Sequence, residues 1–298
     1  MICINCAQPA ASLYVVYSNN HIQLTDCSNC GKEVDKYVEI DNVILFIDLL
    51  LLKPGAYRHL VYNSLETTLS KYPDEKKSTF AVTANWKQYL QELWLRVSHW
   101  KKKFDKLIRL WILLFTFEVY LKWIMEEDHF KHGQASVPIS VMIQLPKLNV
   151  IYQYLYFALY SILDLTIFHF MIQWSICSFI GWGSNIKNSK YIISYTILLS
   201  YGAKIFPVLM IIWPYDTLLS MNIIKYIANL YIIESLRIVT NLSYSVIIPI
   251  FLEATLARFL LVKPILFLLL TRGNMTQLIS YIKSELNSIL HNINISFV

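Results

Sequence analysis

Long runs of apolar residues fill the second half of the chain and predict membrane-spanning helices. A helix needs about 20 mainly apolar residues to cross a bilayer, and four segments meet this length, at about 106–125, 150–180, 191–213 and 244–270. The second segment exceeds the length of one crossing, which predicts a tilted helix or one that extends beyond the membrane. Polar residues interrupt a further helical segment at 223–240, and we expect this segment to be re-entrant or interfacial.

Two shorter patterns precede these spans. Residues 43–52 form a strongly apolar run that ends at Lys53-Pro54-Gly55 and is too short to cross a bilayer. This run could lie in the membrane interface or pack against the N-terminal domain. Residues 80–104 carry large apolar side chains at helical spacing, which predicts an amphipathic helix.

The first 40 residues have a pattern that is typical of short strands and turns. Residues 13–17 and 21–25 are rich in β-branched and aromatic side chains, which favour strands. Ser18-Asn19-Asn20 lies between them and favours a turn. The segment therefore predicts a β-hairpin.

The composition agrees with a membrane protein. Hydrophobic residues make up 56% of the chain and charged residues 15%, whereas about 25% charged residues is typical of soluble domains. The predicted fold class is an α-helical multi-pass membrane protein, with about four transmembrane helices and a small N-terminal β-rich ribbon, which is a predicted zinc ribbon because it contains two CxxC pairs. The predicted domains are a ribbon at 1–40, a juxtamembrane helical region at 41–104 and a transmembrane domain at 105–298.

The basic residues indicate how the chain is oriented. The densest basic run, Lys101-Lys102-Lys103, directly precedes the first apolar span, which favours a membrane-flanking role over a nucleic-acid groove. No basic segment followed by an apolar run stands at the start of the sequence, so no secretory signal is expected. Because positive residues are enriched in cytoplasmic loops, we expect a cytosolic N-terminus, a lumenal 126–149 loop and a cytosolic 181–190 loop.

Four cysteines provide the clearest chemical signal. Cys3-x-x-Cys6 and Cys27-x-x-Cys30 are two close pairs, and the predicted hairpin between them can bring both pairs to one point. Four thiolates complete a tetrahedral shell around one structural zinc ion and leave no open position for catalysis. A domain of this size has too small a core to fold alone, and metal binding would supply the missing stability.

Other candidate sites are less specific. Arg58 and His59, beside Tyr57, could contact a lipid headgroup phosphate or a partner, or could form a helix cap or a salt bridge to the zinc domain. Tyr201 and Lys204 are the candidates for a polar lipid contact inside the membrane. Charged and titratable residues in or near the spans are costly in hydrocarbon and are functional candidates by default: Asp164, His169, Lys204, Glu234, Arg237, Glu253 and Arg258. The sequence contains none of the GxSxG, HExxH, P-loop or GxGxxG motifs, so we do not expect an enzyme.

The cysteine spacing continues into a longer pattern in residues 1–63. Its further matching positions are Leu13-Tyr14, Tyr17-Ser18, Ile22, Leu24-Thr25, Asp35, Tyr37, Glu39, Asp41, Ile47-Asp48-Leu49, Ala56-Tyr57-Arg58-His59-Leu60 and Tyr62-Asn63. This pattern resembles the Arv family, and residues 194–204 and 212–216 are similar to its fungal branch. The resemblance implies a cytosolic zinc ribbon held by the four cysteines, with several membrane helices. It also implies residence in the endoplasmic reticulum membrane, with the Golgi membrane as a second location.

Two functions are compatible with this resemblance. The first is sterol homeostasis and intracellular trafficking of sterols, sphingolipids and glycosylphosphatidylinositol intermediates, with a membrane groove lined by residues such as Tyr195, Tyr201 and Lys204. The alternative is a non-catalytic subunit of the membrane glycosyltransferase complex that initiates glycosylphosphatidylinositol-anchor synthesis. In that case the ribbon and residues 42–63 would dock onto partner subunits. Membrane lipids are the expected partners in the first case, and nucleic acid is expected in neither.

Overall fold

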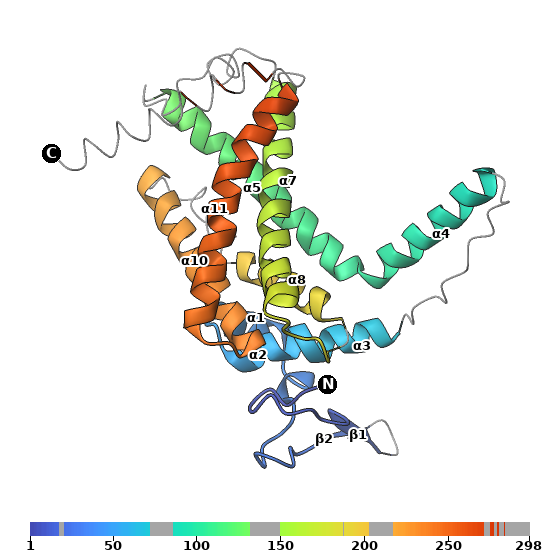
Figure 1. Ribbon diagram of the computed structural model, residues 1–298. Coiled ribbons are helices and arrows are strands. Elements are labelled where there is room, and N and C mark those ends of the chain that lie inside the picture. Colours follow the sequence, from blue (N-terminus) through green and yellow to red (C-terminus); the bar gives the residue numbers. More distant parts are fainter. Residues whose placement is uncertain are drawn as a thin grey trace. The chain divides into compact units, whose positions relative to one another are not determined.

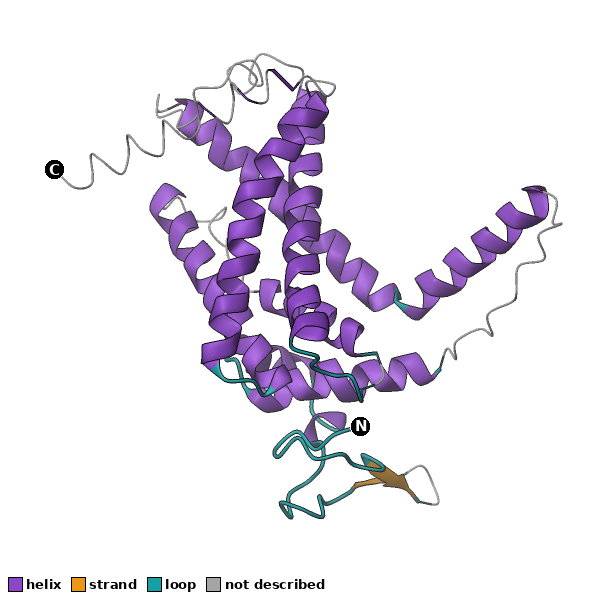
Figure 2. Ribbon diagram, in the orientation of Figure 1, coloured by secondary structure: helices purple, strands orange, loops and turns teal. Residues whose placement is uncertain are grey.

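The computed structural model describes residues 1–17, 21–71, 86–131, 150–186, 188–202 and 217–270, with isolated positions beyond. This part of the chain is almost entirely helical, with one small hairpin near the N-terminus (Figures 1 and 2). The N-terminal elements are β1 (Tyr14–Val16), β2 (Ile22–Leu24), η2 (Lys36–Val38), α1 (Asn42–Leu50), α2 (Pro54–Arg58), η3 (His59–Ser64) and α3 (Leu65–Ser70). The later elements are α4 (Trp86–Lys103), α5 (Asp105–Lys131), α7 (Val150–Trp174), η5 (Ser175–Phe179), α8 (Ser189–Ser200), α10 (Thr217–Thr240) and α11 (Tyr244–Leu270).

The chain divides into two compact units. Unit 1 comprises Met1–Leu113, Gly183–Phe206 and Ile224–Ile247. Unit 2 comprises Leu114–Trp182, Pro207–Ile223 and Ile248–Val298. The long helices α5, α10 and α11 each contribute residues to both units.

The N-terminal ribbon of unit 1 contains the predicted hairpin. β1 and β2 pair antiparallel, with Val15 opposite Gln23 at the centre of the register. Two isolated bridges extend this β structure outside the hairpin, between Ile2 and Pro9 and between Asp26 and Glu33. The ribbon therefore contains the small β-hairpin that the side-chain pattern predicts.

Three short helices follow the ribbon in unit 1. α1 begins at an N-cap, because the Asp41 carboxylate accepts a hydrogen bond from the Val43 backbone at 3.3 Å. Its apolar run ends where the sequence predicts, and Pro54 then occupies the first turn of α2. Within unit 1, α1–α3 lie between the ribbon on one side and α8 and α10 on the other (Figure 1).

Two tyrosine hydroxyls connect these short helices to α10. Tyr62 of η3 donates a hydrogen bond to the Val239 carbonyl at 2.7 Å. Tyr231 of α10 donates to the Leu50 carbonyl, at the C-terminal end of α1, at 2.5 Å. The second half of α10 is thus fixed beside α1 and η3.

Unit 2 is built mainly from α5, α7 and α11. Aromatic side chains pack between these helices, with Trp123 stacked on Tyr154 at 5.3 Å and Phe168 edge-on to Phe251 at 5.9 Å. α7 continues into the π-helical turn η5. α11 contains two prolines, Pro249 and Pro264.

The predicted spans agree with the structure to different extents. Among the described residues, two helices are long and apolar enough to cross a membrane, Ile151–Phe179 and Tyr244–Leu266. They coincide with the predicted spans at 150–180 and 244–270. α5 covers the predicted span at 106–125. α8 covers the first part of the predicted span at 191–213, of which residues 203–213 lie outside the described part. The predicted interfacial segment at 223–240 belongs to the continuous helix α10. The number of spans remains a prediction.

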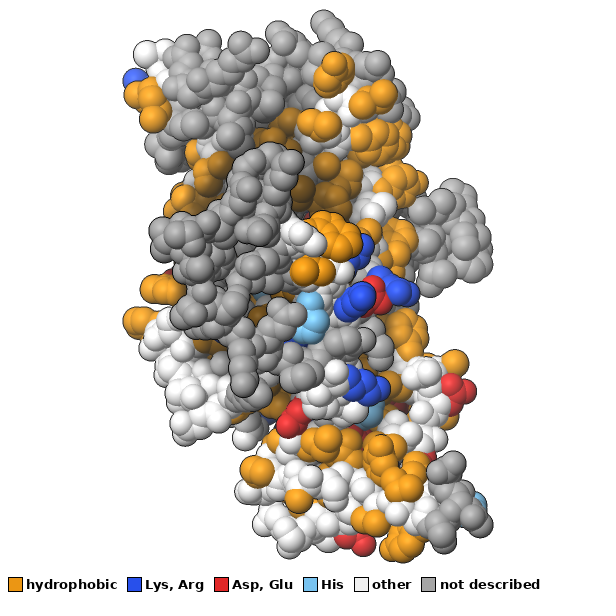
Figure 3. All heavy atoms as spheres, turned by 90° about the vertical axis from the view of Figure 1, so that its right-hand side faces the viewer, with side chains coloured by type: hydrophobic (Ala, Val, Ile, Leu, Met, Phe, Trp, Pro, Cys, Tyr) orange, Lys and Arg blue, Asp and Glu red, His pale blue; other side chains and the backbone are white. Residues whose placement is uncertain are grey.

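The surface of the described helices is consistent with a membrane environment. On the face shown in Figure 3, hydrophobic side chains reach the surface over much of the described part, whereas charged side chains are few. The predicted amphipathic helix at 80–104 is present as α4, and residues 80–85 lie outside the described part.

Candidate metal centre and membrane pocket

The first cysteine pair lies in a tight turn. The Cys3 carbonyl accepts a hydrogen bond from the Ala7 backbone at 2.9 Å, and the Cys3 N–H donates to the Gln8 carbonyl at 2.8 Å. These two bonds close the chain around Cys3 and Cys6 and direct both sulfur atoms to one side.

The second pair repeats this turn. The Cys27 carbonyl accepts from the Gly31 backbone at 2.9 Å, and the Cys27 N–H donates to the Lys32 carbonyl at 2.8 Å. Gly31 has a φ of 65°, in the left-handed region that glycine adopts readily. Ala7 occupies the equivalent position of the first turn with a φ of 61°, where a Cβ atom makes the backbone conformation unfavourable. The two cysteine turns thus have the same backbone geometry, and the first is strained because alanine occupies its left-handed position.

The four sulfur atoms converge on one point. Cys3 Sγ lies 3.8 Å from Cys30 Sγ, Cys6 Sγ lies 3.6 Å from Cys27 Sγ, and all four atoms lie within 4.8 Å of one another. A tetrahedral zinc ion with Zn–S bonds of about 2.3 Å requires sulfur atoms about 3.8 Å apart. The cysteine cluster therefore fits one metal ion, and Cys3 and Cys27 are buried.

The cluster also has the electrostatics of a cation site. A hydrogen bond with the Gln8 backbone lowers the pKa of the Cys6 thiol to about 6. For Cys30, the Lys32 backbone also lowers the pKa, but burial and hydrogen bonds with the other three thiols outweigh it and raise the value to about 11. Without a cation, ionisation of one thiol makes ionisation of its neighbours less favourable. A divalent cation between the four sulfur atoms would stabilise all four thiolates together.

Arg58 contacts the first cysteine turn directly. Its Nη1 atom donates to the carbonyls of Ile4 and Asn5, at 3.0 Å in each case. Both carbonyls belong to the two residues between Cys3 and Cys6. This guanidinium therefore fixes the turn that presents two of the four sulfur atoms.

His59 and Asn63 reach a buried carboxylate of the ribbon. Asp35 is completely buried, and its Oδ2 atom lies 2.7 Å from His59 Nδ1 and 2.7 Å from Asn63 Nδ2. Asn63 also exchanges two hydrogen bonds with the backbone of Ile2, at 2.9 and 3.0 Å. The π-helical turn η3, a geometry often found at functional sites, presents both side chains to the ribbon.

A second buried carboxylate connects the ribbon with α1. Asp48 accepts hydrogen bonds from the Tyr37 hydroxyl at 2.8 Å and from Lys53 Nζ at 2.6 Å. These two donors lower the pKa of Asp48, with the Lys53 bond as the largest cause. Burial, together with the Asp48 carboxylate, raises the pKa of Tyr37. This network keeps Asp48 ionised and Tyr37 neutral.

The three candidate contact residues thus occupy different environments. Tyr57 is 1% exposed, and burial raises the pKa of its hydroxyl. Arg58 and His59 are partly exposed and form their contacts with the ribbon. The bonds of Arg58 and His59 therefore provide the link to the N-terminal ribbon that is one of the alternatives from the sequence, and a contact with a headgroup or partner stays a prediction.

The predicted intramembrane contact is described only in part. Tyr201 is buried at the C-terminal end of α8, while Lys204 lies outside the described residues. The groove expected beside Tyr195, Tyr201 and Lys204 therefore also stays a prediction.

A cluster of charged residues connects three helices of unit 2. Asp164 of α7 is buried, and its two oxygens lie 2.8 Å from Arg258 Nε and 3.2 Å from Lys122 Nζ. Lys122 also lies 3.6 Å from the Glu118 carboxylate and 4.2 Å from the centre of the Tyr160 ring. Opposite charges neutralise one another in this cluster, which lowers the cost of placing them in an apolar bundle.

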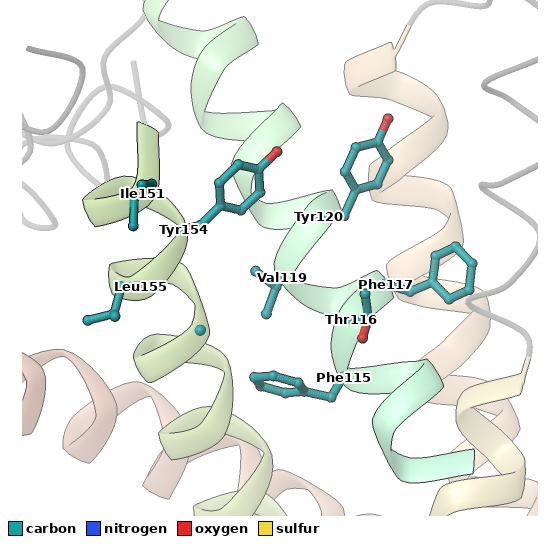
Figure 4. Close-up of a pocket in the computed structure, with 9 residues that line it drawn as sticks. Phe115, Thr116, Phe117, Val119, Tyr120, Ile151, Tyr154 and Leu155 are labelled. Carbon is teal, nitrogen blue, oxygen red and sulfur yellow. The ribbon is translucent and has the colours of Figure 1, made fainter. Parts of the chain in front are cut away.

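An apolar pocket lies between α5 and α7 in unit 2. Its volume is about 560 Å³, within the range of about 300–1,000 Å³ that is common for ligand sites. Phe115 and Val119 extend from α5 toward α7, and Tyr154 extends from α7 toward α5 (Figure 4). The complete lining is Phe115, Thr116, Phe117, Val119, Tyr120, Ile151, Tyr154, Leu155 and Ala158.

The pocket is next to polar groups along the same helices. Ser161 follows Ala158 by one turn of α7, is completely buried and has no hydrogen-bond partner among the described residues. Asp164 follows by a further turn. The pocket and its surroundings therefore combine a large apolar surface with a small number of polar atoms.

Several of these residues were not identified from the sequence as site residues. Asp35, Asp48 and Asn63 belong to the wider sequence pattern, but nothing in their spacing indicates that they would be buried together. The ion pair between Lys122 and Glu118 could have been predicted, since the two residues stand four positions apart inside a predicted span.

Comparison with known proteins gives a consistent result. The sequence model of the Arv1-like family matches residues 2–236. Protein ARV1 of Saccharomyces cerevisiae is 50% identical in an alignment 309 residues long, gaps included, that covers 96% of this chain and 96% of that protein. Protein ARV1 of Eremothecium gossypii is also 50% identical, over 96% of this chain and 95% of its own length. Protein ARV1 of Homo sapiens is 45% identical over 62 residues, 21% of this chain and 23% of that protein. No solved structure matches.

Proposed function

The chain belongs to the Arv1-like family, and from this membership we propose that it takes part in sterol homeostasis and lipid trafficking in the endoplasmic reticulum membrane. The lipids are sterols, sphingolipids and intermediates of glycosylphosphatidylinositol synthesis. The protein acts without catalysis of its own, and its ribbon faces the cytosol and holds one structural zinc ion through Cys3, Cys6, Cys27 and Cys30.

The pocket between α5 and α7 is the observation that supports a lipid ligand most directly. Its lining is almost entirely apolar and includes four aromatic side chains, which suits the flat ring system of a sterol or an acyl chain. A sterol carries a single hydroxyl, and the Ser161 hydroxyl stands one turn from the pocket without a partner among the described residues. The charged groups around Asp164 would exclude hydrocarbon at that end.

Sterol transfer between vesicles tests this proposal. Purified, zinc-loaded protein should accelerate the movement of a fluorescent sterol from donor to acceptor vesicles. The substitution Ala158→Phe places an aromatic ring in the pocket, which obstructs it, and should abolish most of this acceleration. Ile162→Phe adds a ring of the same size at an exposed position of α7 and should leave transfer unchanged. Absence of transfer by folded wild-type protein, or equal transfer by both variants, would contradict the proposal.

A second candidate function, as a non-catalytic subunit of the glycosyltransferase complex that initiates glycosylphosphatidylinositol synthesis, is favoured by the surface of the hairpin. Five apolar residues of this hairpin are between 41% and 59% exposed: Tyr14, Val15, Val16, Tyr17 and Ile22. Exposed apolar patches on a small soluble domain are typical of protein interfaces. On this reading the hairpin docks onto a partner subunit outside the membrane.

Purification in mild detergent separates the two functions. The double substitution Val15→Ser with Tyr17→Ser should reduce recovery of glycosyltransferase subunits while the zinc content is unchanged. Gln23→Ser, on the opposite strand of the same hairpin, is the matched control. Full recovery with the double variant would exclude the hairpin as the docking surface.

A further inference from the structure

Helix α1 has two apolar faces, of which the described residues cover only one. Leu45, Asp48 and Leu49 are buried, and Leu45 packs in a core cluster with Ile4 and Tyr37 of the ribbon. The opposite face is between 49% and 63% exposed and contains aliphatic and aromatic residues: Val43, Ile44, Phe46, Ile47 and Leu51. A surface of this composition needs a partner that is not water.

The contact between α1 and α10 indicates the depth of this face relative to the membrane. The Tyr231 hydroxyl of α10 bonds to the Leu50 carbonyl at the end of α1. Three residues further along α10, about 4.5 Å along the axis, Glu234 begins a partly exposed polar cluster with Arg237 and Tyr244. An exposed carboxylate and guanidinium belong in water or among headgroups rather than in hydrocarbon.

The residues on the other side of Tyr231 are apolar and exposed. Tyr226, Ile227 and Leu230 of α10 are between 42% and 71% exposed, as expected for a helix surface that faces lipid. Tyr231 therefore stands close to the boundary between the apolar and polar parts of α10, and α1 is attached at this level.

The dimensions of α1 fit a helix that lies in the plane of this boundary. α1 has nine residues, or about 14 Å at 1.5 Å per residue, and cannot cross a hydrocarbon core of about 30 Å. Interfacial helices bury an apolar face about 5–10 Å into the region between headgroups and acyl chains. Polar residues mark both ends of α1, at Asp41 and Lys53.

We propose that α1 is an interfacial membrane anchor, whose exposed face of Val43, Ile44, Phe46, Ile47 and Leu51 is embedded in the bilayer surface. The opposite face of α1 carries the metal-binding ribbon, which is thereby held in the water directly outside the headgroups. α1 thus fixes the position of the ribbon relative to the membrane, in addition to the chain that connects the ribbon to the helical bundle.

Depth-dependent fluorescence quenching tests the anchor. A single labelled cysteine replaces Phe46 in a Cys177→Ser background, with the four cluster cysteines loaded with zinc, and the full chain is placed in lipid nanodiscs. Val16→Cys on the hairpin is the control, since Val16 is 59% exposed but belongs to the ribbon. Lipids with a nitroxide near the headgroup should quench the label at position 46 about threefold more than the label at position 16, and aqueous iodide should show the reverse order.

Two results would overturn the proposal. Strong iodide quenching at position 46, without quenching by nitroxide lipid, would place α1 in water. Protection from both quenchers would show that protein covers this face. Ile47→Cys repeats the measurement at a second position, and unchanged zinc content shows that each labelled ribbon is folded.

Discussion

The carboxylate of Asp35 and the side-chain amide of Asn63 lie 2.7 Å apart, although 28 residues separate them in the chain. Both side chains are completely buried. Asp35 belongs to the ribbon and Asn63 to η3, so this bond joins the segment that carries the four cysteines to the short helices within unit 1. The geometry of the four cysteines and the position of these helices are therefore physically coupled.

Substitution of Asp35 should uncouple the two segments. Asp35→Asn removes the charge and places an amide group against the Asn63 amide, which leaves buried donors without an acceptor. We expect a loss of stability of about 2–3 kcal/mol, measured as a lower midpoint of thermal unfolding in detergent. Glu39→Gln, at an exposed position four residues away, should change the midpoint little. Equal midpoints for Asp35→Asn and wild type would show that this bond contributes nothing.

The two cysteine turns predict opposite effects of two small substitutions. Ala7→Gly should relieve the cost of a left-handed alanine and stabilise the ribbon by about 1 kcal/mol. Gly31→Ala should destabilise it by about 1–2 kcal/mol, even though its Cβ atom would meet no other atom within 4 Å. Zinc release to a colorimetric chelator should be slower in the first variant and faster in the second. Faster release from Ala7→Gly would contradict this account of the turn.

Asp48 predicts a specific pH dependence. Its pKa is lowered in the folded chain by Lys53 and Tyr37, so its contribution to stability is present above the ordinary aspartate pKa of about 3.9. This contribution is lost as the pH falls through the lower folded-state value. Asp48→Asn should therefore be less stable than wild type at pH 7, and the difference should shrink below about pH 4. A difference that is independent of pH would mean that ionisation of Asp48 does not matter.

The charged cluster of unit 2 should respond non-additively to substitution. Arg258→Met leaves Asp164 with one of its two cationic partners, and Asp164→Asn leaves two cations without their shared carboxylate. Each single variant should lower the thermal midpoint. The double variant should be more stable than the sum of the two losses predicts, with a coupling of about 1–3 kcal/mol. Simple additivity would show that Asp164 and Arg258 do not interact in the folded protein.

Features with a local cause could be predicted from the sequence. Apolar runs gave the helices at 150–180 and 244–270, and β-branched residues on either side of Ser18-Asn19-Asn20 gave the hairpin. The cysteine spacing gave the cluster, because a CxxC turn directs both sulfur atoms by short-range geometry.

Features that depend on tertiary contacts could not be predicted in this way. For Arg58 the sequence leaves a headgroup contact and a bond to the N-terminal domain as alternatives, and only the fold places its guanidinium on the Ile4 and Asn5 carbonyls, more than 50 residues away. Asp164 and Lys122 lie in different apolar runs, and nothing along the chain indicates that they meet. Only the packing of α5 against α7 determines that pair.

If the four thiolates bind one zinc ion, as we propose, elemental analysis of the purified protein will detect it. The full chain, purified from membranes in detergent and washed free of loosely bound metal, should contain one zinc ion per polypeptide. Cys27→Ser should lose that ion, while Cys177→Ser should keep it, since Cys177 lies outside the cluster. Wild-type protein that is folded and contains no stoichiometric zinc would contradict the account.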